Sequence, residues 1–283
     1  MKRPLIRTRH AVALAAAALL TTALAAPAHA APASSGATTA STAAKGGGKA
    51  QGTSTLTQRA GASKPKGKPR VETKVVGGTP ASQAYPFLTY VGGCTGSLIK
   101  ANWVVTARHC PSPSTVRVGS TDSGSGGTVA SVSRTVNHPW LDVKLLQLST
   151  SVSQAPIVIP SASDPVGTPT RIIGWGLTCS TRGCAANPTI AHELDTSIVA
   201  DSACTGGING PYEICTGNPG NKGACYGDSG GPQVKKVSGV WQLIGATSRA
   251  GDGGSTCAVA PSIYTDLPSI RSWITQQVGT LPS

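Results

Sequence analysis

Acidic side chains are scarce in this 283-residue sequence, which has 11 Asp and Glu against 24 Lys and Arg. The resulting formal net charge of +13 is unevenly spread. Residues 1–74 carry 12 basic side chains and one acid, Glu72 (12 − 1 = +11), whereas residues 75–283 carry 12 basic and 10 acidic side chains (12 − 10 = +2). The basic charge therefore lies in the N-terminal quarter, and residues 75–283 lack the basicity of a nucleic-acid-binding domain.

Long apolar runs are also missing, except for one near the N-terminus. Four basic residues precede an apolar run from Ala11 to Ala26, and the small-x-small sequence Ala28-His29-Ala30 follows it. The run is too short and too rich in alanine for a comfortable membrane span. We therefore interpret residues 1–30 as a secretory signal peptide in preference to a membrane anchor. The sequence thus predicts a secreted, extracellular protein without a stable membrane anchor.

Large apolar side chains are nearly absent from residues 31–74, which consist mainly of Ala, Ser, Thr, Gly, Lys and Pro. Such a segment cannot bury enough surface to offset the entropy of ordering it, so we expect a disordered, basic propeptide. An alternative is that this segment stays in the mature chain and binds a cell surface or a polymer. The Ala-, Gly- and Thr-rich composition fits a GC-rich bacterial genome, and we expect a bacterial source.

Metal-binding patterns are missing from residues 75–283. There is no CxxC pair, the three histidines do not cluster beside cysteines, and residues 117–134 hold a single acid, Asp122. Zinc and calcium sites need more ligands than these, so we expect no metal and no cofactor. Eight cysteines in an exported chain are instead typical of four disulfides. They are Cys94, Cys110, Cys179, Cys184, Cys204, Cys215, Cys225 and Cys257.

Short runs of β-branched residues, bounded by Gly and Pro, fill residues 75–283. They are typical of an all-β sandwich or barrel and occur at Trp103–Ala107, Thr115–Val118, Thr128–Val136, Val143–Leu148, Thr170–Gly174, Ile198–Ala200 and Val240–Ala246. The segment after Pro268 instead has helical spacing, with apolar residues at 270, 273, 274 and 278 and with Gly279 placed to end the helix. The pattern predicts one all-β domain over residues 75–283 with a C-terminal helix.

The sequence Gly-Asp-Ser-Gly-Gly-Pro at 227–232 holds Ser229 between an acid and two glycines. A serine is a poor nucleophile unless a base takes its proton, and glycines leave backbone N–H groups free to stabilise an oxyanion. His109 follows a strand-like run and precedes Cys110, and Asp142 heads another apolar run. Taken singly, the three are more often a turn serine, a structural histidine and a solvated acid. Taken together, they indicate a nucleophile, a base and a carboxylate that orients the base.

The residues around all three resemble the chymotrypsin/trypsin superfamily of secreted serine endopeptidases. Gly227–Pro232 resembles the serine motif of that family, Thr106–Cys110 its histidine motif and Asp142–Leu146 its aspartate motif, in the family's order. Further resemblances extend the match over essentially all of residues 75–283, and they are Val75–Gly78, Gly96–Ile99, Gly174–Gly176 and Ile214–Gly217. The resemblance implies two antiparallel six-stranded β-barrels, with the site at their junction, and a C-terminal α-helix.

The resemblance also implies a role for each site residue. Ser229 would attack the peptide carbonyl, His109 would act as general base and then as general acid, and Asp142 would orient His109. The N–H groups of Gly227 and Ser229 would form the oxyanion hole. The implied disulfides are Cys94–Cys110, Cys204–Cys215 and Cys225–Cys257, and elimination leaves Cys179–Cys184 as the fourth.

The segment Lys74-Val75-Val76-Gly77-Gly78 resembles the activation junction of the family. Cleavage after Lys74 would free an ammonium on Val75, and in the family this group pairs with the acid before the serine, which here is Asp228. The buried ion pair orders the oxyanion hole and the pocket, so we expect a zymogen. The alternative for Val75–Gly78 is an ordinary strand and turn.

The same resemblance assigns the primary specificity pocket. Its floor falls at Gly223, which cannot pair with a substrate Lys or Arg, and its walls include Ser248, Ala250 and Ser262. We therefore expect protein or peptide substrates with uncharged, apolar side chains in this pocket. Such an enzyme would not cut efficiently after its own Lys74, so we expect activation by a separate trypsin-like protease.

Four residues depart from the family pattern. Arg249 replaces the usual Trp, and it either favours acidic residues in the substrate or points to solvent. Thr95 replaces a glycine, and Arg108 and Lys144 stand where small or apolar residues are usual. These changes concern local packing and leave the three central residues intact. We expect a monomeric serine endopeptidase, and the alternative is a catalytically inactive binding protein on the same fold.

Overall fold

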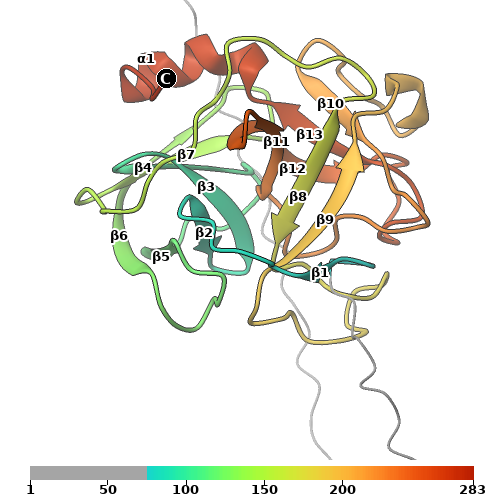
Figure 1. Cartoon of the computed structure of the whole chain (residues 1–283), viewed down its shortest axis with the longest axis horizontal. Helices are drawn as coiled ribbons and strands as arrows, with labels where there is room; N and C mark the ends of the chain where they lie inside the picture. Colours follow the sequence, from blue (N-terminus) through green and yellow to red (C-terminus); the bar gives the residue numbers. More distant parts are fainter. Residues whose placement is uncertain (1–74) are drawn as a thin grey trace, which may run out of the picture. The chain divides into compact units, whose positions relative to one another are not determined.

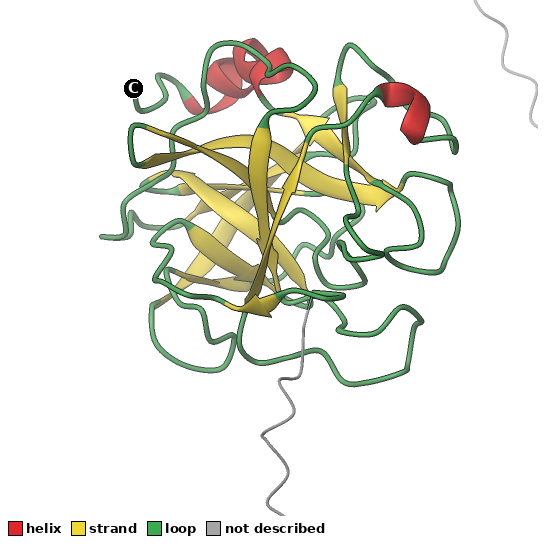
Figure 2. Cartoon of the chain, turned by 45° about the vertical axis from the view of Figure 1, so that its right-hand side comes forward, coloured by secondary structure: helices red, strands yellow, loops and turns green. Residues whose placement is uncertain are grey.

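The computed structural model describes residues 75–283. The expected signal peptide (1–30) and propeptide (31–74), with Lys74 at its end, lie outside the described residues. Residues 75–283 form a closed barrel, a second sheet and a short C-terminal helix (Figure 1). Strands occupy the centre, and loops and short helices lie at the periphery (Figure 2).

The first half is a closed six-stranded antiparallel barrel with the strand order β2-β3-β4-β7-β6-β5. In β5 the side chains of Val116 and Val118 are buried, whereas Thr115 and Arg117 lie outside, as the two-residue period of a half-buried strand requires. The strand β4 pairs with both β3 and β7 and is buried along its whole length. The strands are β2 (Leu88–Val91), β3 (Cys94–Lys100), β4 (Trp103–Thr106), β5 (Thr115–Val118), β6 (Thr128–Asn137) and β7 (Lys144–Leu148).

The second half is a seven-stranded antiparallel sheet with the order β1-β9-β8-β11-β12-β13-β10. A bridge between Ile198 and Thr216 brings the end of β9 against β10, so the strands from β8 to β13 also close into a ring. The strand β1 pairs with β9 and is the seventh. The strands are β1 (Thr79–Pro80), β8 (Pro169–Gly174), β9 (His192–Ser197), β10 (Glu213–Thr216), β11 (Pro232–Val237), β12 (Val240–Ala250) and β13 (Ser262–Asp266).

The predicted strand at Ile198–Ala200 is wrong by six residues, because the chain there is already leaving β9 after a single bridge at Ile198. The strand itself, His192–Ser197, carries polar side chains and so lacks the apolar run that marked the other strands. Its Glu193 is buried because Tyr85, Ser82 and Arg171 hydrogen-bond its carboxylate. The burial of this strand therefore depends on partners distant in sequence.

The C-terminal helix α1 (Arg271–Val278) confirms the expected helix and follows the 3₁₀ turn Pro268–Ile270. A second 3₁₀ turn spans Asp201–Ala203. Ile274 and Val278 join the core of the first barrel, and Lys100 donates to the carbonyl of Val278 at 2.6 Å. The helix therefore ties the end of the second half back onto the first. None of the helices in the described part is long and apolar enough for a membrane crossing.

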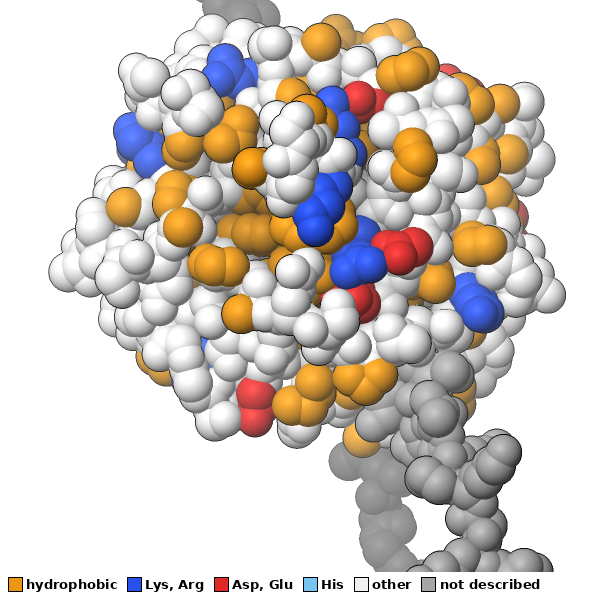
Figure 3. Space-filling model, viewed as in Figure 1, with side chains coloured by type: hydrophobic (Ala, Val, Ile, Leu, Met, Phe, Trp, Pro, Cys, Tyr) orange, Lys and Arg blue, Asp and Glu red, His pale blue; other side chains and the backbone are white. Residues whose placement is uncertain are grey.

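Four disulfides join Cys94 to Cys110, Cys179 to Cys184, Cys204 to Cys215 and Cys225 to Cys257, and no described cysteine is free. These are the four pairs that the resemblance and elimination implied. On the face shown in Figure 3, basic and acidic side chains lie scattered or next to each other, in keeping with the balance of +2 for residues 75–283.

Gly230 sits where the two halves meet, and we predict that it tolerates no side chain. Its N–H donates to Thr247 O at 2.7 Å, its φ is +74°, and a Cβ there would lie 2.2 Å from Thr106 Oγ1. Gly230→Ala should lower the free energy of unfolding in urea by about 3 kcal/mol or more. Gly239→Ala is the control, since Gly239 has φ +86° with nothing within 4 Å of its Cβ position. It should cost only about 1–2 kcal/mol. Equal losses would contradict the close approach at Gly230.

Candidate active site

Three segments bring the predicted catalytic side chains to the junction of the two halves. His109 lies in the turn after β4, Asp142 lies just before β7, and Ser229 lies just before β11. The disulfide Cys94–Cys110 fixes the turn that carries His109. The segment that carries Ser229 is held against the first barrel because Thr95 N donates to Ser229 O at 2.9 Å.

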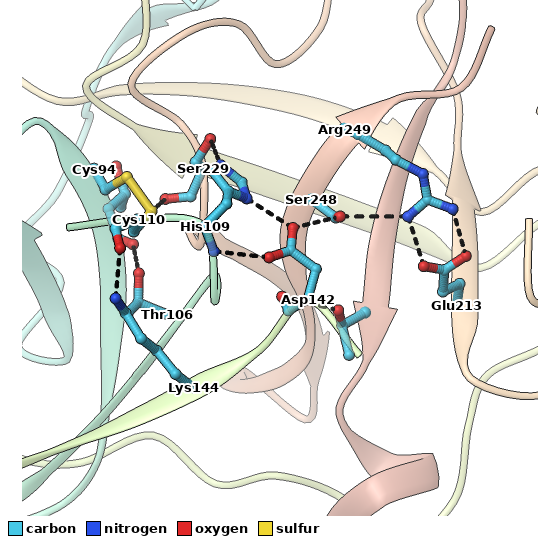
Figure 4. A network of polar contacts seen from close by, with 12 residues as sticks. Cys94, Thr106, His109, Cys110, Asp142, Lys144, Glu213, Ser229, Ser248 and Arg249 are labelled. Atoms are coloured by element: carbon cyan, nitrogen blue, oxygen red, sulfur yellow. Dashed lines mark hydrogen bonds and ion pairs between the residues drawn. A yellow bond between two sulfur atoms is a disulfide. The ribbon is translucent and has the colours of Figure 1, made fainter. Parts of the chain in front are cut away.

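The three side chains form one hydrogen-bonded line (Figure 4). Ser229 Oγ lies 2.7 Å from His109 Nε2, and His109 Nδ1 lies 2.7 Å from Asp142 Oδ2. The backbone N–H of His109 donates to Asp142 Oδ1 at 3.0 Å, and Ser248 Oγ donates to Asp142 Oδ2 at 2.7 Å. An ionised Asp142 favours the tautomer with the proton on Nδ1, which leaves Nε2 free to accept the proton of Ser229.

The environment of Asp142 keeps its carboxyl group ionised. Burial works against the charged form, but hydrogen bonds from the side chains of His109 and Ser248 outweigh it, so the pKa of Asp142 lies below its ordinary value. A carboxylate that stays ionised at neutral pH can stabilise an imidazolium formed at His109.

The backbone around Ser229 presents two free donors. Gly227 has φ +108°, a conformation that favours glycine, and a Cβ there would lie 2.3 Å from Asn187 Nδ2. Among residues 75–283, no backbone carbonyl accepts a hydrogen bond from the N–H of Gly227 or Ser229. Asn187, which the sequence did not single out, donates to Trp175 O at 2.8 Å and to Tyr226 O at 3.1 Å and so holds the chain beside these donors.

Asp228 is buried directly beneath this turn. Its carboxylate accepts hydrogen bonds from Gly176 N at 2.8 Å and from Cys225 N at 2.9 Å. Burial nevertheless raises the pKa of Asp228 to about 6. A Cβ at Gly174 or Gly176 would lie 2.2 or 2.0 Å from a carboxylate oxygen, so the Gly-Trp-Gly sequence is needed to admit the acid.

Val75 is fully buried at the start of the described chain. Its side chain packs in the core of the second half with Ile172, Ile214 and Ala224. The next residue, Val76, forms a bridge with Gly223 and accepts a hydrogen bond from Gly223 N at 3.0 Å. The segment that begins at Val75 is therefore built into the same turn region that carries Asp228.

A cleft of about 920 Å³ opens beside Ser229 and His109. The predicted wall residues Ser248, Ala250 and Ser262 line it, together with residues that the sequence did not assign: Leu177, Ala224, Tyr226, Thr247 and Ala258. Asp142 is the one acid in the lining, and it is already engaged with His109.

Gly223, the predicted pocket floor, stays a prediction: it is next to Ala224, which lines the cleft. Its backbone is occupied by the bridge to Val76, and a Cβ there would meet Ala258 Cβ at 3.6 Å. Ala224 and Ala258 lie in the lining and add small apolar side chains to it. Within residues 75–283, no three His, Cys, Asp or Glu side chains gather as a metal site would require.

The sequence model of the Trypsin family matches residues 75–274. The chain belongs to this family of serine endopeptidases. It is 34% identical over 204 residues to a trypsin of Sarcophaga bullata, which covers 64% of this chain and 77% of that one. It is 31% identical over 245 residues to chymotrypsin-like elastase family member 1 of Macaca fascicularis, which covers 75% of this chain and 92% of that one.

The solved structure of neuropsin, a serine protease expressed in the limbic system of mouse brain, shows the same fold. It has a TM-score of 0.60 and 24% identity, and the match covers 68% of this chain and 94% of that chain. The relatives come from animals and lend no support to the expected bacterial source.

Arg249 lines the cleft of this trypsin-family chain, and its side chain is 40% exposed. Its guanidinium forms a bidentate ion pair with Glu213, with distances of 2.6 and 2.8 Å. It also donates to Gly207 O at 2.8 Å. The sequence did not reveal this partner, because Glu213 lies 36 positions earlier on another strand.

Lys144 is almost fully buried behind the histidine turn (Figure 4). Its ammonium donates to the carbonyls of Cys110 and Pro111 and to Ser112 Oγ. Burial lowers the pKa of Lys144. The ammonium thus anchors the three residues that follow His109, which explains why a charged residue replaces an apolar one here.

We predict that Lys144→Met lowers both stability and activity. Loss of the charged hydrogen bonds should reduce the free energy of unfolding by about 2 kcal/mol, and a looser His109 turn should reduce kcat at least about tenfold. Lys100→Met is the matched control, because it removes one ammonium–carbonyl bond, to Val278, at the C-terminal helix. It should leave kcat unchanged. Equal kcat values for the two variants would show that Lys144 does not support the site.

Proposed function

We propose that residues 75–283 are the catalytic domain of a secreted serine endopeptidase, in which Ser229, His109 and Asp142 form the catalytic triad. The observation that carries the proposal is the line of two 2.7 Å contacts from Ser229 Oγ through the imidazole to Asp142. The same geometry disfavours the alternative of an inactive binding protein, because all three groups are present and already in contact.

In the proposed reaction, Ser229 Oγ bonds to the carbonyl carbon of the substrate while its proton passes to His109 Nε2. The carbonyl oxygen becomes an oxyanion, and the N–H groups of Gly227 and Ser229 are free to donate to it. Asp142 stabilises the imidazolium. His109 then gives the proton to the leaving amine, the C–N bond breaks, and an acyl-enzyme remains. Water then bonds to the acyl carbon while its proton passes to His109 Nε2. His109 returns a proton to Ser229 Oγ, the ester C–O bond breaks, and the carboxylic acid product leaves.

A zymogen switch at Lys74–Val75 is supported by the burial of Asp228. Among residues 75–283 this carboxylate receives two amide hydrogen bonds and no ion pair, and a buried charge without a counterion is costly. Because its pKa is raised, the uncut chain loses stability as the pH rises from about 4 to about 6. Cleavage would create an ammonium on Val75, which is already buried against the segment that carries Asp228.

The lack of a free acid in the cleft lining that residues 75–283 form supports a preference for uncharged side chains. Ala224 and Ala258 offer no carboxylate to a substrate Lys or Arg. We therefore propose that a separate trypsin-like protease cuts after Lys74, that residues 31–74 are a propeptide, and that residues 1–30 direct secretion. A mature chain that begins at Val75 would exclude a role for residues 31–74 in binding a surface or a polymer.

We predict that the nucleophile becomes reactive only after cleavage at Lys74. The purified precursor is treated with a serine-directed phosphonofluoridate before and after limited tryptic cleavage, and the adduct is located by peptide mass. Labelling of Ser229 in the cut chain alone is the expected result. Ser229→Ala is the control and should stay unlabelled. Labelling before cleavage would remove the switch, and no labelling of a folded chain starting at Val75 would favour an inactive binding protein.

We also predict the order of substrates for the cut enzyme. The substrates are peptides of one sequence in which only the residue that donates the scissile carbonyl varies. This residue is Ala, Val, Leu, Phe, Asp or Lys. The best apolar residue should exceed Lys at least about tenfold in kcat/KM, which is the discrimination that an apolar pocket gives. A preference for Lys would show that a carboxylate reaches the end of the cleft.

A further inference from the structure

The hydrogen-bonded line that starts at Ser229 continues beyond Asp142 to a second charged pair (Figure 4). Ser248 Oγ donates to Asp142 Oδ2 at 2.7 Å, and Arg249 Nη1 lies 3.4 Å from the same hydroxyl oxygen. Arg249 is held in turn by Glu213, with contacts of 2.6 and 2.8 Å. Two residues that the proposed reaction does not use therefore end the line.

Ser248 occupies an irregular position in β12. The pairing of β12 with β13 joins Thr247 to Tyr264 and Arg249 to Ile263, so Ser248 is the extra residue of a β-bulge. Bulges near active sites commonly re-aim a side chain. Here the bulge places the hydroxyl of Ser248 on Asp142, and the next residue along the strand is Arg249.

The ion pair of Arg249 and Glu213 reaches from this bulge across the sheet. Glu213 belongs to β10, which is separated from β12 by β13, and its side chain is 5% exposed. Glu213 also accepts a hydrogen bond from Asn209 N at 2.8 Å, so its carboxylate is fixed from two sides. The ion pair with Glu213 raises the pKa of Arg249, so the guanidinium stays charged throughout the working range.

We propose that Arg249, anchored by Glu213, is a positioning residue that holds the hydroxyl of Ser248 on Asp142 and thereby fixes the orientation of His109. This inference rests on the proposed function. Both Nη atoms of Arg249 are engaged within the chain, by Glu213, Ser248 and Gly207, while the side chain stays 40% exposed in the cleft.

The test compares Arg249→Gln, Glu213→Gln and the double variant with the wild-type cut enzyme. Each single change should lower kcat about tenfold with KM changed less than about twofold, because orientation at the reacting atoms is lost while the other residues of the cleft lining remain in place. Asp195→Asn is the matched control, since it removes the exposed acid of another arginine ion pair, away from the cleft. It should leave kcat unchanged.

The pH profile of kcat/KM separates positioning from a general loss of structure. The charged groups around Asp142 are His109, Lys144 and Arg249, with Glu213 behind Arg249. Arg249→Gln removes a positive charge, and this favours protonation of His109. The acidic limb of the kcat/KM profile should therefore move to higher pH by a few tenths of a pH unit. Glu213→Gln removes a negative charge and should move it to lower pH. The double variant should return the limb toward its original place while kcat stays low.

Arg249→Lys keeps the charge without the bidentate geometry and covers the case in which the glutamine variants fail to fold. It should leave the acidic limb in place and lower kcat about threefold. Unchanged kcat in folded variants, or acidic limbs that shift in the same direction in the two single variants, would overturn the role of Arg249. Activity of the wild-type cut enzyme would still support the proposed function in that case. A wild-type cut enzyme without activity would overturn both.

Discussion

Asp142 Oδ2 accepts two hydrogen bonds of 2.7 Å, one from His109 and one from Ser248, and the site depends on this meeting point. Asp142 and His109 come from the first barrel, whereas Ser248 and Ser229 come from the second half. The reacting geometry therefore exists only while the two halves stay in contact. The backbone hydrogen bond from Thr95 N to Ser229 O (2.9 Å) joins them at the proposed nucleophile itself.

The junction between the two halves requires glycines at positions without room for a Cβ, and it encloses buried charged groups. Gly227 and Gly230 take positive φ angles with no room for a Cβ, and Gly174 and Gly176 admit a buried acid. Within residues 75–283, that acid, Asp228, has two amide partners and no ion pair, which is the basis of the proposed link between Val75 and the turn that carries Ser229. Lys144 adds a buried ammonium on the other side of His109. Buried charged groups, Asp228 and Lys144, therefore lie on both sides of the hydrogen-bonded line from Ser229 to Asp142.

The fold class and the central residues could be predicted from the sequence because their signals are local. The β-branched run at Thr115–Val118 matches a strand, and the glycines around Ser229 mark a turn that only they can form. Partners that are distant in sequence could not be predicted. The burial of β9 depends on Tyr85 and Arg171, and the pairing of Arg249 depends on Glu213.

The first seconds of ester hydrolysis by the cut enzyme show directly whether Ser229 and His109 react as one unit. A nitrophenyl ester of an apolar amino acid is mixed with the chain that begins at Val75, and the released nitrophenol is followed. A burst of about one equivalent per folded chain, followed by slower turnover, is expected, and Ser229→Ala and His109→Ala should show no burst. A folded wild-type chain without a burst, or a burst that survives in Ser229→Ala, would contradict a joint reaction of Ser229 and His109.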